Sequence, residues 1–374
     1  MDFIPVNTPL LDGNEKLYLN ECIDTGWISS EGLFVKKLET GMASYVGRKY
    51  ATTVCNGSVA LDLCVDALRL NKGDEVIMPA FTIISCAAAL VRRGIKPVLV
   101  DSDPTTWNMD VNQIEDKITS KTRAIMVVHI YGLPVDMDVV IEIAQRHNLY
   151  IIEDAAEAHG LEYKGKKCGG FGTISAMSFY PNKHITTGEG GIVMMDDEYL
   201  KERCDSLKNL CHVPNKRFHH EELGYNFRMS NIQAAVGVAQ LEKIEEHLEI
   251  KKELGRHYQQ LLKGTDGLQL PLEKTDYACN MYWVFGVVMS ENIKMSAEEM
   301  IRKLANRNIG CRPFFYPMHL QPVFRRMGLF INEKYPIAEK LGDRGFYVPS
   351  GLTVNRYQRE YIADVVKDEI IKMY

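Results

Sequence analysis

The stretch Ser178-Phe179-Tyr180-Pro181-Asn182-Lys183-His184-Ile185-Thr186-Thr187-Gly188-Glu189-Gly190-Gly191 places a lysine between two apolar runs. These runs, residues 174–179 and 192–195, have the length and the bounding residues of β-strands. A lysine in a loop is usually just a solvated side chain. Here the flanks are apolar and aromatic, and three glycines in four residues let a backbone or a ligand approach closely. A partly desolvated lysine loses its proton more easily, so the stretch predicts carbonyl chemistry, by way of a Schiff base, at Lys183.

The whole chain has the composition of an ordinary globular protein. It has 374 residues, of which 46% are hydrophobic and 25% charged, enough for a large domain and a smaller one. The net charge of −5 gives no reason to expect nucleic acid or an anionic membrane as a partner. No apolar run is long enough to span a bilayer, and the N-terminus lacks a signal-peptide pattern. We therefore expect a cytoplasmic protein.

The cysteines and histidines give little support for a metal centre. The nine cysteines are odd in number, include no Cys-x-x-Cys pair and lie among apolar neighbours, which predicts reduced core residues. The ten histidines include no His-Glu-x-x-His, and the pair at 219–220 lies in a polar stretch typical of a surface loop. We expect no metal site.

Strand-like and helix-like segments alternate from about residue 50 to residue 195. The candidate strands are 51–55, 75–78, 97–101, 124–129, 150–153 and the two that flank Lys183, and the candidate helices are 59–68, 84–92, 113–117 and 139–147. The run 124–128 is continuously apolar, as expected when helices cover both faces of a mostly parallel sheet. Ligands bind outside the carboxyl ends of such strands. Segments 56–58, 129–132 and 154–159 should therefore share one rim with Lys183.

The C-terminal part predicts a second unit. Residues 231–262 read as one long helix with Ser230 as its N-cap. After the turn at 264–267 we expect a strand at 283–289, a helix at 296–306, a loop at 311–322 and a closing helix from residue 356. The fold is thus α/β, with a large domain at residues 1–250 and a small C-terminal α/β domain at residues 251–374.

Two segments on the expected rim carry candidate cofactor ligands. Asn56-Gly57-Ser58 stands where a strand should give way to a helix, so its N–H groups form an anion site, although an isolated Asn-Gly-Ser is more often a turn. Asp154 follows a strand and can pair with a cationic ring nitrogen, although acidic residues there are often caps or turn formers. A Schiff-base lysine, a carboxylate and a phosphate site together indicate pyridoxal 5'-phosphate (PLP).

The segment at residues 25–30, with Trp27 between glycine and serines, is also unusual. The default interpretation of Trp27 is a packing plug, and the alternative is a loop that folds over a ligand.

Taken together, the motifs resemble those of the DegT/StrS family of PLP-dependent sugar aminotransferases. The resemblance covers essentially the whole chain and implies a fold-type I PLP-transferase with a mostly parallel, mixed sheet. The matching motifs, which follow in family order, are residues 25–30, 56–61, 153–158, 178–191, 224–232 and 312–319. Within the family, the chain is most similar to the enzymes that form GDP-perosamine.

The resemblance implies a role for individual residues around the cofactor. Lys183 matches the Schiff-base lysine, and Asp154 matches the carboxylate that keeps the pyridine nitrogen protonated. The residues that match phosphate ligands are Gly57, Ser58, Ser178 and, from the neighbouring subunit, Asn226. Glu157 lies near the position beside the ring hydroxyl. Ile83 stands where the family commonly stacks an aromatic side chain on the ring, so that an aliphatic contact or Phe81 would take its place.

The resemblance also implies a substrate and a partner. The residues on the nucleotide-sugar side are Trp27, Ser29, Arg228, Tyr316 and His319. The implied reaction moves the amino group of L-glutamate to C4 of a nucleotide-linked 4-keto-6-deoxy sugar and leaves 2-oxoglutarate. GDP-4-keto-6-deoxy-D-mannose, converted to GDP-perosamine for O-antigen or another surface polysaccharide, is the first candidate, and a UDP- or dTDP-linked 4-keto-6-deoxyglucose is the alternative. The shared ligand Asn226 implies a homodimer with shared active sites.

Other functions fit the sequence less well. A PLP-dependent sugar dehydratase of the same fold replaces the Schiff-base lysine by histidine, so Lys183 argues against it. A PLP-binding regulator would need a nucleic-acid-binding module, and the chain has no basic stretch to suggest one. A non-catalytic scaffold remains as the last alternative.

Overall fold

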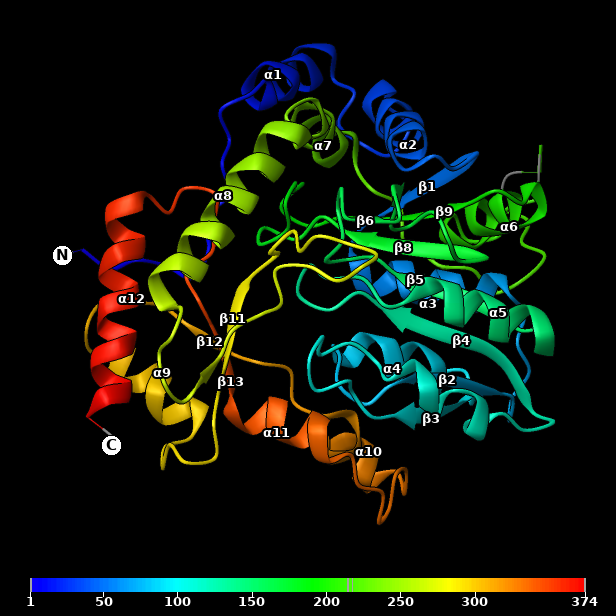
Figure 1. Cartoon of the computed structure of the whole chain (residues 1–374). Coiled ribbons are helices and arrows are strands. Elements are labelled where there is room, and N and C mark those ends of the chain that lie inside the picture. The colour runs from blue at the N-terminus through cyan, green and yellow to red at the C-terminus, as the bar shows by residue number, and fades with distance from the viewer. Residues whose placement is uncertain (1, 214, 217, 373–374) are drawn as a thin grey trace.

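The large sheet of the protein carries the rim that the sequence predicts. The structure, a computed structural model of the chain, describes residues 2–213, 215–216 and 218–372. These residues form a seven-stranded sheet, a four-stranded sheet and a two-stranded ribbon (Figure 1). The strands of the large sheet, in spatial order, are β1 (Tyr50–Val54), β9 (Gly191–Met195), β8 (Ile174–Ser178), β5 (Tyr150–Asp154), β4 (Thr122–Val128), β2 (Glu75–Pro79) and β3 (Lys96–Val100). Strand β9 runs antiparallel to both its neighbours, and the other strands share one direction.

Helices cover both faces of this sheet, as the apolar run in β4 predicts. Successive side chains of a strand point to opposite faces, so Ala124, Met126 and Val128 enter one core and Ile125 and Val127 enter the other. The first core is completed by α3 (Gly57–Ala67), α4 (Ile84–Val91) and α6 (Glu198–Lys208), and the second by α2 (Leu33–Val46), α5 (Met137–His147) and α7 (Asn231–Glu242). The α/β prediction is confirmed.

One helix predicted in the N-terminal half is wrong, and one helix there was not predicted. The segment predicted as a helix at 113–117 forms two 3-10 turns, η1 (Val111–Gln113) and η2 (Glu115–Lys117). The segment is too short for a series of α-helical hydrogen bonds. The helix that was not predicted is α1 (Glu15–Thr25). It buries only Glu15 and Cys22, so its apolar residues follow no helical stripe.

The single long helix predicted at 231–262 is wrong. Ser230 does cap α7 through a capping box, but the helix ends at Lys243, whose backbone has φ −104° and ψ 4°. A second helix, α8 (Ile244–Leu262), then continues in a new direction (Figure 1). Helix α7 packs against α1 and α2, whereas α8 packs against α12 (Arg356–Ile371). Because the helix breaks at Lys243, the two halves of this amphipathic stretch pack against different helices.

A third core lies around the four-stranded antiparallel sheet. That sheet consists of β10 (Leu268–Gln269), β11 (Phe285–Met289), β13 (Gly345–Val348) and β12 (Arg312–Pro313), and its core includes residues of α9 (Ala297–Ala305) and α12. Helix α8 joins the units, because Leu248 packs in a core of the large sheet and Tyr258 in the third core. Ile4 also packs in the third core, where its carbonyl accepts the Gly310 N–H at 2.8 Å. We propose that the chain divides within α8, near the predicted boundary.

The remaining elements are short. They are β6 (Glu162–Tyr163), β7 (Lys166–Lys167), η3 (Met318–Leu320), α10 (Pro322–Arg326) and α11 (Pro336–Arg344). Among the described residues, no helix combines the length and the apolar character that a membrane crossing requires. The cysteines are all free thiols, but the prediction that they lie in the core is wrong for Cys279, which is exposed, and Cys55 is half-buried.

Candidate active site

Lys183 lies in the connection between β8 and β9, as predicted, and its side chain is 10% exposed. Its backbone N–H donates to the Tyr180 carbonyl at 2.9 Å, which makes the connection a tight turn. The ammonium nitrogen is 3.9 Å from Glu157 Oε1 and 3.8 Å from the centre of the Trp283 ring. Burial lowers the pKa of the Lys183 amine, although Glu157 and Asp154 act in the opposite direction. The amine is therefore easier to deprotonate than a solvated lysine.

Glu157 is the carboxylate that faces this amine. Its Oε2 accepts the Tyr131 N–H at 2.9 Å, and the side chain is buried. Burial raises the pKa of Glu157, while the nearby Lys183 ammonium and the Tyr131 N–H lower it. Lys183 and Glu157 therefore form a buried ion pair, in which each group favours the charged form of the other.

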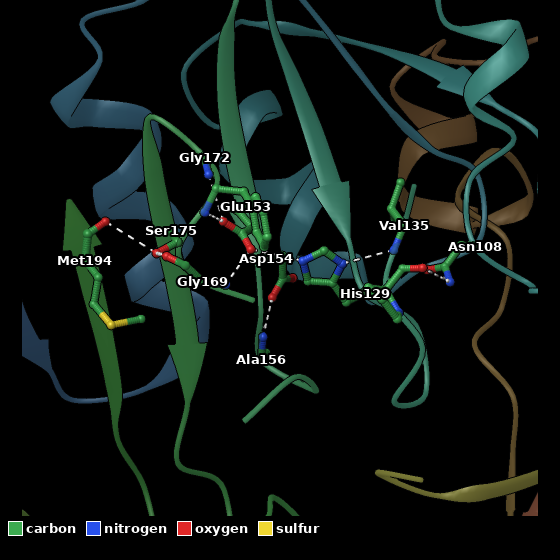
Figure 2. Close-up of polar contacts among 12 residues, drawn as sticks. Asn108, His129, Val135, Glu153, Asp154, Ala156, Gly169, Gly172, Ser175 and Met194 are labelled. Atoms are coloured by element: carbon green, nitrogen blue, oxygen red, sulfur yellow. Dashed lines mark hydrogen bonds and ion pairs between the residues drawn. The ribbon is translucent and has the colours of Figure 1, made fainter. Parts of the chain in front are cut away.

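Asp154 ends β5 and is 1% exposed. Its Oδ1 accepts the Ala156 N–H at 3.0 Å (Figure 2). Its Oδ2 accepts the Cys86 thiol at 3.2 Å. Burial raises the pKa of Asp154, and these two donors together with Lys183 oppose that rise. The carboxylate is thus held in one orientation at the carboxyl end of a central strand.

The neighbouring carboxylate, Glu153, has a different role. Figure 2 shows it on the side of β5 away from Asp154, where it accepts N–H groups from Gly172 at 2.8 Å, from Phe171 and from Gly169. Burial raises its pKa, but the His129 hydrogen bond at 3.0 Å and the backbone donors outweigh burial and bring the pKa to about 2. Glu153 therefore ties the chain before β8 to β5.

Glu153, His129 and Cys168 also bring ligand atoms within 4.8 Å of one another, a grouping that their spacing in the sequence did not suggest. The His129 Nδ1 accepts the Val135 N–H at 3.2 Å, and both carboxylate oxygens of Glu153 accept backbone N–H groups. These lone pairs already accept hydrogen bonds from the backbone and are not free to bind a metal ion. We therefore assign the cluster a structural role.

The predicted anion site is built where α3 begins. The Asn56 side chain caps the helix by accepting the Val59 N–H at 3.0 Å, so the first turn exposes its remaining N–H groups. A Cβ on Gly57 would come within 2.6 Å of the Ser178 Cβ, so glycine is what allows the helix end to lie against β8. Ser58 Oγ is 2.7 Å from Ser85 Oγ. Serine hydroxyls and free N–H groups thus converge on one point.

The residues predicted beside the cofactor ring differ in exposure. Ile83 is 40% exposed at the N-cap of α4, whereas Phe81 is fully buried. The Phe81 ring packs 5.9 Å from the rings of Tyr131 and Phe314. Phe81 is therefore committed to the core, and Ile83 is the side chain of the two that is free to meet a ligand.

Several predicted substrate residues lie elsewhere in the single chain. Trp27 is 58% exposed, so its default interpretation as a packing plug is wrong. The Asn231 amide donates to the Trp27 carbonyl at 2.6 Å, and the Asn231 N–H donates to the Ser29 carbonyl at 2.9 Å. Asn226 is exposed and pairs with Asn209, whose side chain accepts from Arg228 at 2.6 Å. Arg228 lines a cavity of about 1180 Å³ whose walls do not include Lys183.

Tyr316 and His319 lie toward the C-terminal unit. Tyr316 is 52% exposed and lines a cavity of about 930 Å³ together with Pro313 and Arg344. His319 is fully buried, and its Nε2 is 2.9 Å from Glu339 Oε1. An imidazole held in this way does not reach a nucleotide, so we leave His319 out of the site proposed below.

The structure adds side chains that the sequence did not single out. Ser85 and Cys86 follow the carboxyl end of β2, so the rule that placed the other segments on the rim would have found them. Trp283 and Tyr131 contact Lys183 and Glu157 respectively. Trp283 comes from the segment before β11, and no motif in the neighbouring sequence associated it with the active site.

The chain is similar to known aminotransferases over almost its whole length. The sequence profile of the DegT/DnrJ/EryC1/StrS aminotransferase family matches residues 9–367. The GDP-perosamine synthase of Escherichia coli O157:H7 is 43% identical over 98% of this chain and 99% of its own length. The UDP-N-acetyl-3-dehydro-alpha-D-glucosamine 3-aminotransferase of Acidithiobacillus ferrooxidans is 31% identical over 98% of this chain and 95% of its own. The crystal structure of S. venezuelae DesV superposes with a TM-score of 0.91 at 29% identity, covering 99% of each chain.

Proposed function

The chain belongs to the DegT/DnrJ/EryC1/StrS aminotransferase family, and from this we propose that it transfers the amino group of L-glutamate to C4 of GDP-4-keto-6-deoxy-D-mannose. The products are GDP-perosamine and 2-oxoglutarate, and the cofactor is PLP. The near full-length similarity to the E. coli GDP-perosamine synthase is the observation that carries the choice of substrate. A role in O-antigen or other surface polysaccharide synthesis follows from this product.

The residues on the rim fit PLP. The close contact at Gly57 leaves the N-terminus of α3 beside Ser178, and N–H and O–H donors of this kind hold a phosphate. Ser58, Ser178 and that helix end are our candidates for the phosphate, with Asn226 of a second copy. Asp154 offers a buried carboxylate to a ring nitrogen, and Ile83 offers an apolar contact to the ring. Glu157 would lie beside the ring hydroxyl.

When bound, PLP supplies an aldehyde that binds amines covalently and a ring that withdraws electrons. The chain supplies the proton transfers. Lys183 would hold the cofactor, and its neutral amine, once free, would take the proton from the α-carbon of glutamate and deliver it to the carbon of the cofactor that had been the aldehyde. Asp154 keeps the ring nitrogen protonated, and Glu157 holds the Lys183 nitrogen in place between transfers. The amino group would remain on the cofactor after 2-oxoglutarate has left and before the keto sugar enters, so we expect ping-pong kinetics.

The nucleotide sugar needs cations and apolar surface at some distance from Lys183. Arg228 is our candidate for the diphosphate, because a guanidinium binds phosphate oxygens in pairs. The side chains of Trp27 and Ser29 are exposed, and that of Tyr316 is 52% exposed. All three are therefore available to a sugar or a nucleotide base. Arg228 lines a cavity whose walls do not include the Lys183 of its own chain, which supports a homodimer in which each copy completes the site of the other.

The choice of substrate gives the first prediction. With glutamate saturating, we expect kcat/KM for GDP-4-keto-6-deoxymannose to exceed that for UDP- and dTDP-linked 4-keto-6-deoxyglucose by at least about tenfold. Contacts of the protein with the nucleotide base distinguish one nucleotide from another by about this factor. A coupled assay for 2-oxoglutarate measures all three substrates. A preference for either alternative nucleotide would overturn the substrate and leave the chemistry standing. Failure to aminate any keto sugar would overturn both.

The shared site gives a second prediction. We expect Lys183→Ala and Asn226→Asp each to be inactive as homodimers, the second because its new carboxylate repels the cofactor phosphate. After subunit exchange, random pairing would restore about a quarter of the wild-type sites, since half of the dimers are mixed and each has one intact site. Activity of an equimolar mixture measures this. If both variants fold and exchange without regaining activity, Asn226 acts within its own chain and the shared-site proposal is wrong.

A further inference from the structure

Trp283 contacts Lys183 in two ways. Its ring centre lies 3.8 Å from the Lys183 ammonium nitrogen, which places the cation over the ring face. Its indole N–H donates to the carbonyl of Asn182, the residue immediately before Lys183, at 2.8 Å. One side chain therefore fixes both the backbone that carries the lysine and the nitrogen at its tip. Trp283 is 3% exposed, so water does not weaken either contact.

The indole is itself held firmly. The Trp283 ring stacks on the Tyr131 ring with a centroid distance of 5.8 Å. The backbone carbonyl of Trp283 accepts a hydrogen bond from the buried Lys251 ammonium at 2.7 Å. A Cβ on Gly132 would come within 2.7 Å of the Trp283 backbone nitrogen, so the chain after β4 lies directly against this residue. Trp283 also leads into β11 of the four-stranded sheet. The second unit thus presents a rigid indole to the lysine of the first.

We propose that Trp283 is a positioning residue for Lys183: its ring face holds the lysine nitrogen beside Glu157 and favours the cationic form of that nitrogen. This inference rests on the proposed function, because it concerns the lysine that would hold the cofactor. No other indole in the described residues contacts Lys183.

The groups around Lys183 determine the expected sign of a pH effect. Glu157 and Asp154 favour the cation, whereas burial disfavours it. His159 and His184 also face the lysine, but burial lowers the pKa of both imidazoles, to about 3 for His159, so they are neutral at working pH. The ring face acts in the same direction as the two carboxylates. Removing it should lower the pH at which the Lys183 nitrogen loses its proton.

The test compares Trp283→Leu with Trp283→Phe, which keeps a ring face but not the N–H donor. In the PLP-loaded protein, the pH midpoint of the visible absorbance is expected to fall by about one unit in Trp283→Leu and by less in Trp283→Phe. We expect kcat with glutamate to fall at least about tenfold in Trp283→Leu, with KM changed much less, because the loss concerns the proton transfer. The pH midpoint of Trp283→Phe should lie closer to that of wild type than to that of Trp283→Leu.

The matched control is Trp107, another buried indole, which packs 5.4 Å from Phe314 in the same aromatic cluster. Trp107→Leu should lose comparable packing without moving the midpoint. A readout that does not need PLP is the pH dependence with which acetic anhydride acylates Lys183, followed by mass spectrometry. Its midpoint should fall in Trp283→Leu as well.

These readouts separate the two proposals. If wild-type protein shows no PLP absorbance, the proposed function fails and the acylation midpoints decide the role of Trp283. If the midpoints of Trp283→Leu and wild type agree within about 0.2 pH units, Trp283 is a packing residue and the inference is overturned.

Discussion

Replacement of Lys183 by alanine is expected to lower turnover by roughly a thousandfold or more while leaving PLP bound, because one residue supplies both the covalent link and the proton transfers. The phosphate donors at α3 and Ser178 remain in the variant, so the cofactor keeps its main anchor. The measurement is kcat with glutamate and GDP-4-keto-6-deoxymannose, together with the visible spectrum. The wild-type absorbance of the lysine-linked cofactor should be lost and that of free aldehyde should appear.

Borohydride reduction of the wild-type protein provides the control for this prediction. It should fix the cofactor on Lys183, which a mass map identifies. Lys251 is the competing amine, since it is fully buried and burial lowers its pKa to about 7. Its ammonium donates to the carbonyls of Trp283 and Ser350, which directs it into the core between the two units. A label on Lys251, or on any other lysine, would overturn the assignment of Lys183.

Asp154→Asn should reduce turnover by at least about a hundredfold, because the amide keeps the shape of the carboxylate and loses the charge that holds a ring proton. Both carboxylate oxygens have donors, Ala156 N–H and the Cys86 thiol, so the wild-type group is fixed in place. An asparagine would turn its NH2 group toward one of these donors. The glutamate half-reaction, followed in a stopped-flow spectrometer, isolates the affected step.

Glu153→Gln is the matched control, since Glu153 precedes Asp154 in β5 and is equally buried. Its carboxylate bonds the Gly169–Gly172 segment and His129, so the variant should unfold at lower denaturant concentration. The folded fraction should keep a near-normal half-reaction rate. Near-normal rates in Asp154→Asn would instead show that another group protonates the ring, and the role of Asp154 would be abandoned.

The sequence by itself determined the elements of the large sheet and the place of Lys183. The apolar run within β4 required two covered faces, and two cores are found there. The strand signals on both sides of residues 180–190 placed the lysine in a connection, which lies between β8 and β9. Ser230 predicted the start of α7. Each of these features depends on residues within one turn or one strand, so local chemistry encodes it.

The sequence misjudged features that depend on distant packing. Nothing in the amphipathic pattern of residues 231–262 marks Lys243 as a helix end, because the two helices differ in what they pack against and not in composition. Trp27 has the size of a core residue, yet its neighbours in the single chain leave it exposed. The motif order associated Arg228 with the substrate, and the structure places Arg228 in the wall of a cavity that Lys183 does not line.

Only the tertiary structure decided which side chains meet at the site. Cys86 reaches Asp154 across 68 positions of sequence, and Trp283 reaches Asn182 across 101. The first contact depends on β2 and β5 lying on either side of β4, and the second on the C-terminal unit packing over the rim. Strand order and the packing of one unit on another arise from the burial of apolar surface summed over the whole chain. No local pattern contains that sum, so the contact between Trp283 and Lys183 became visible only in the folded molecule.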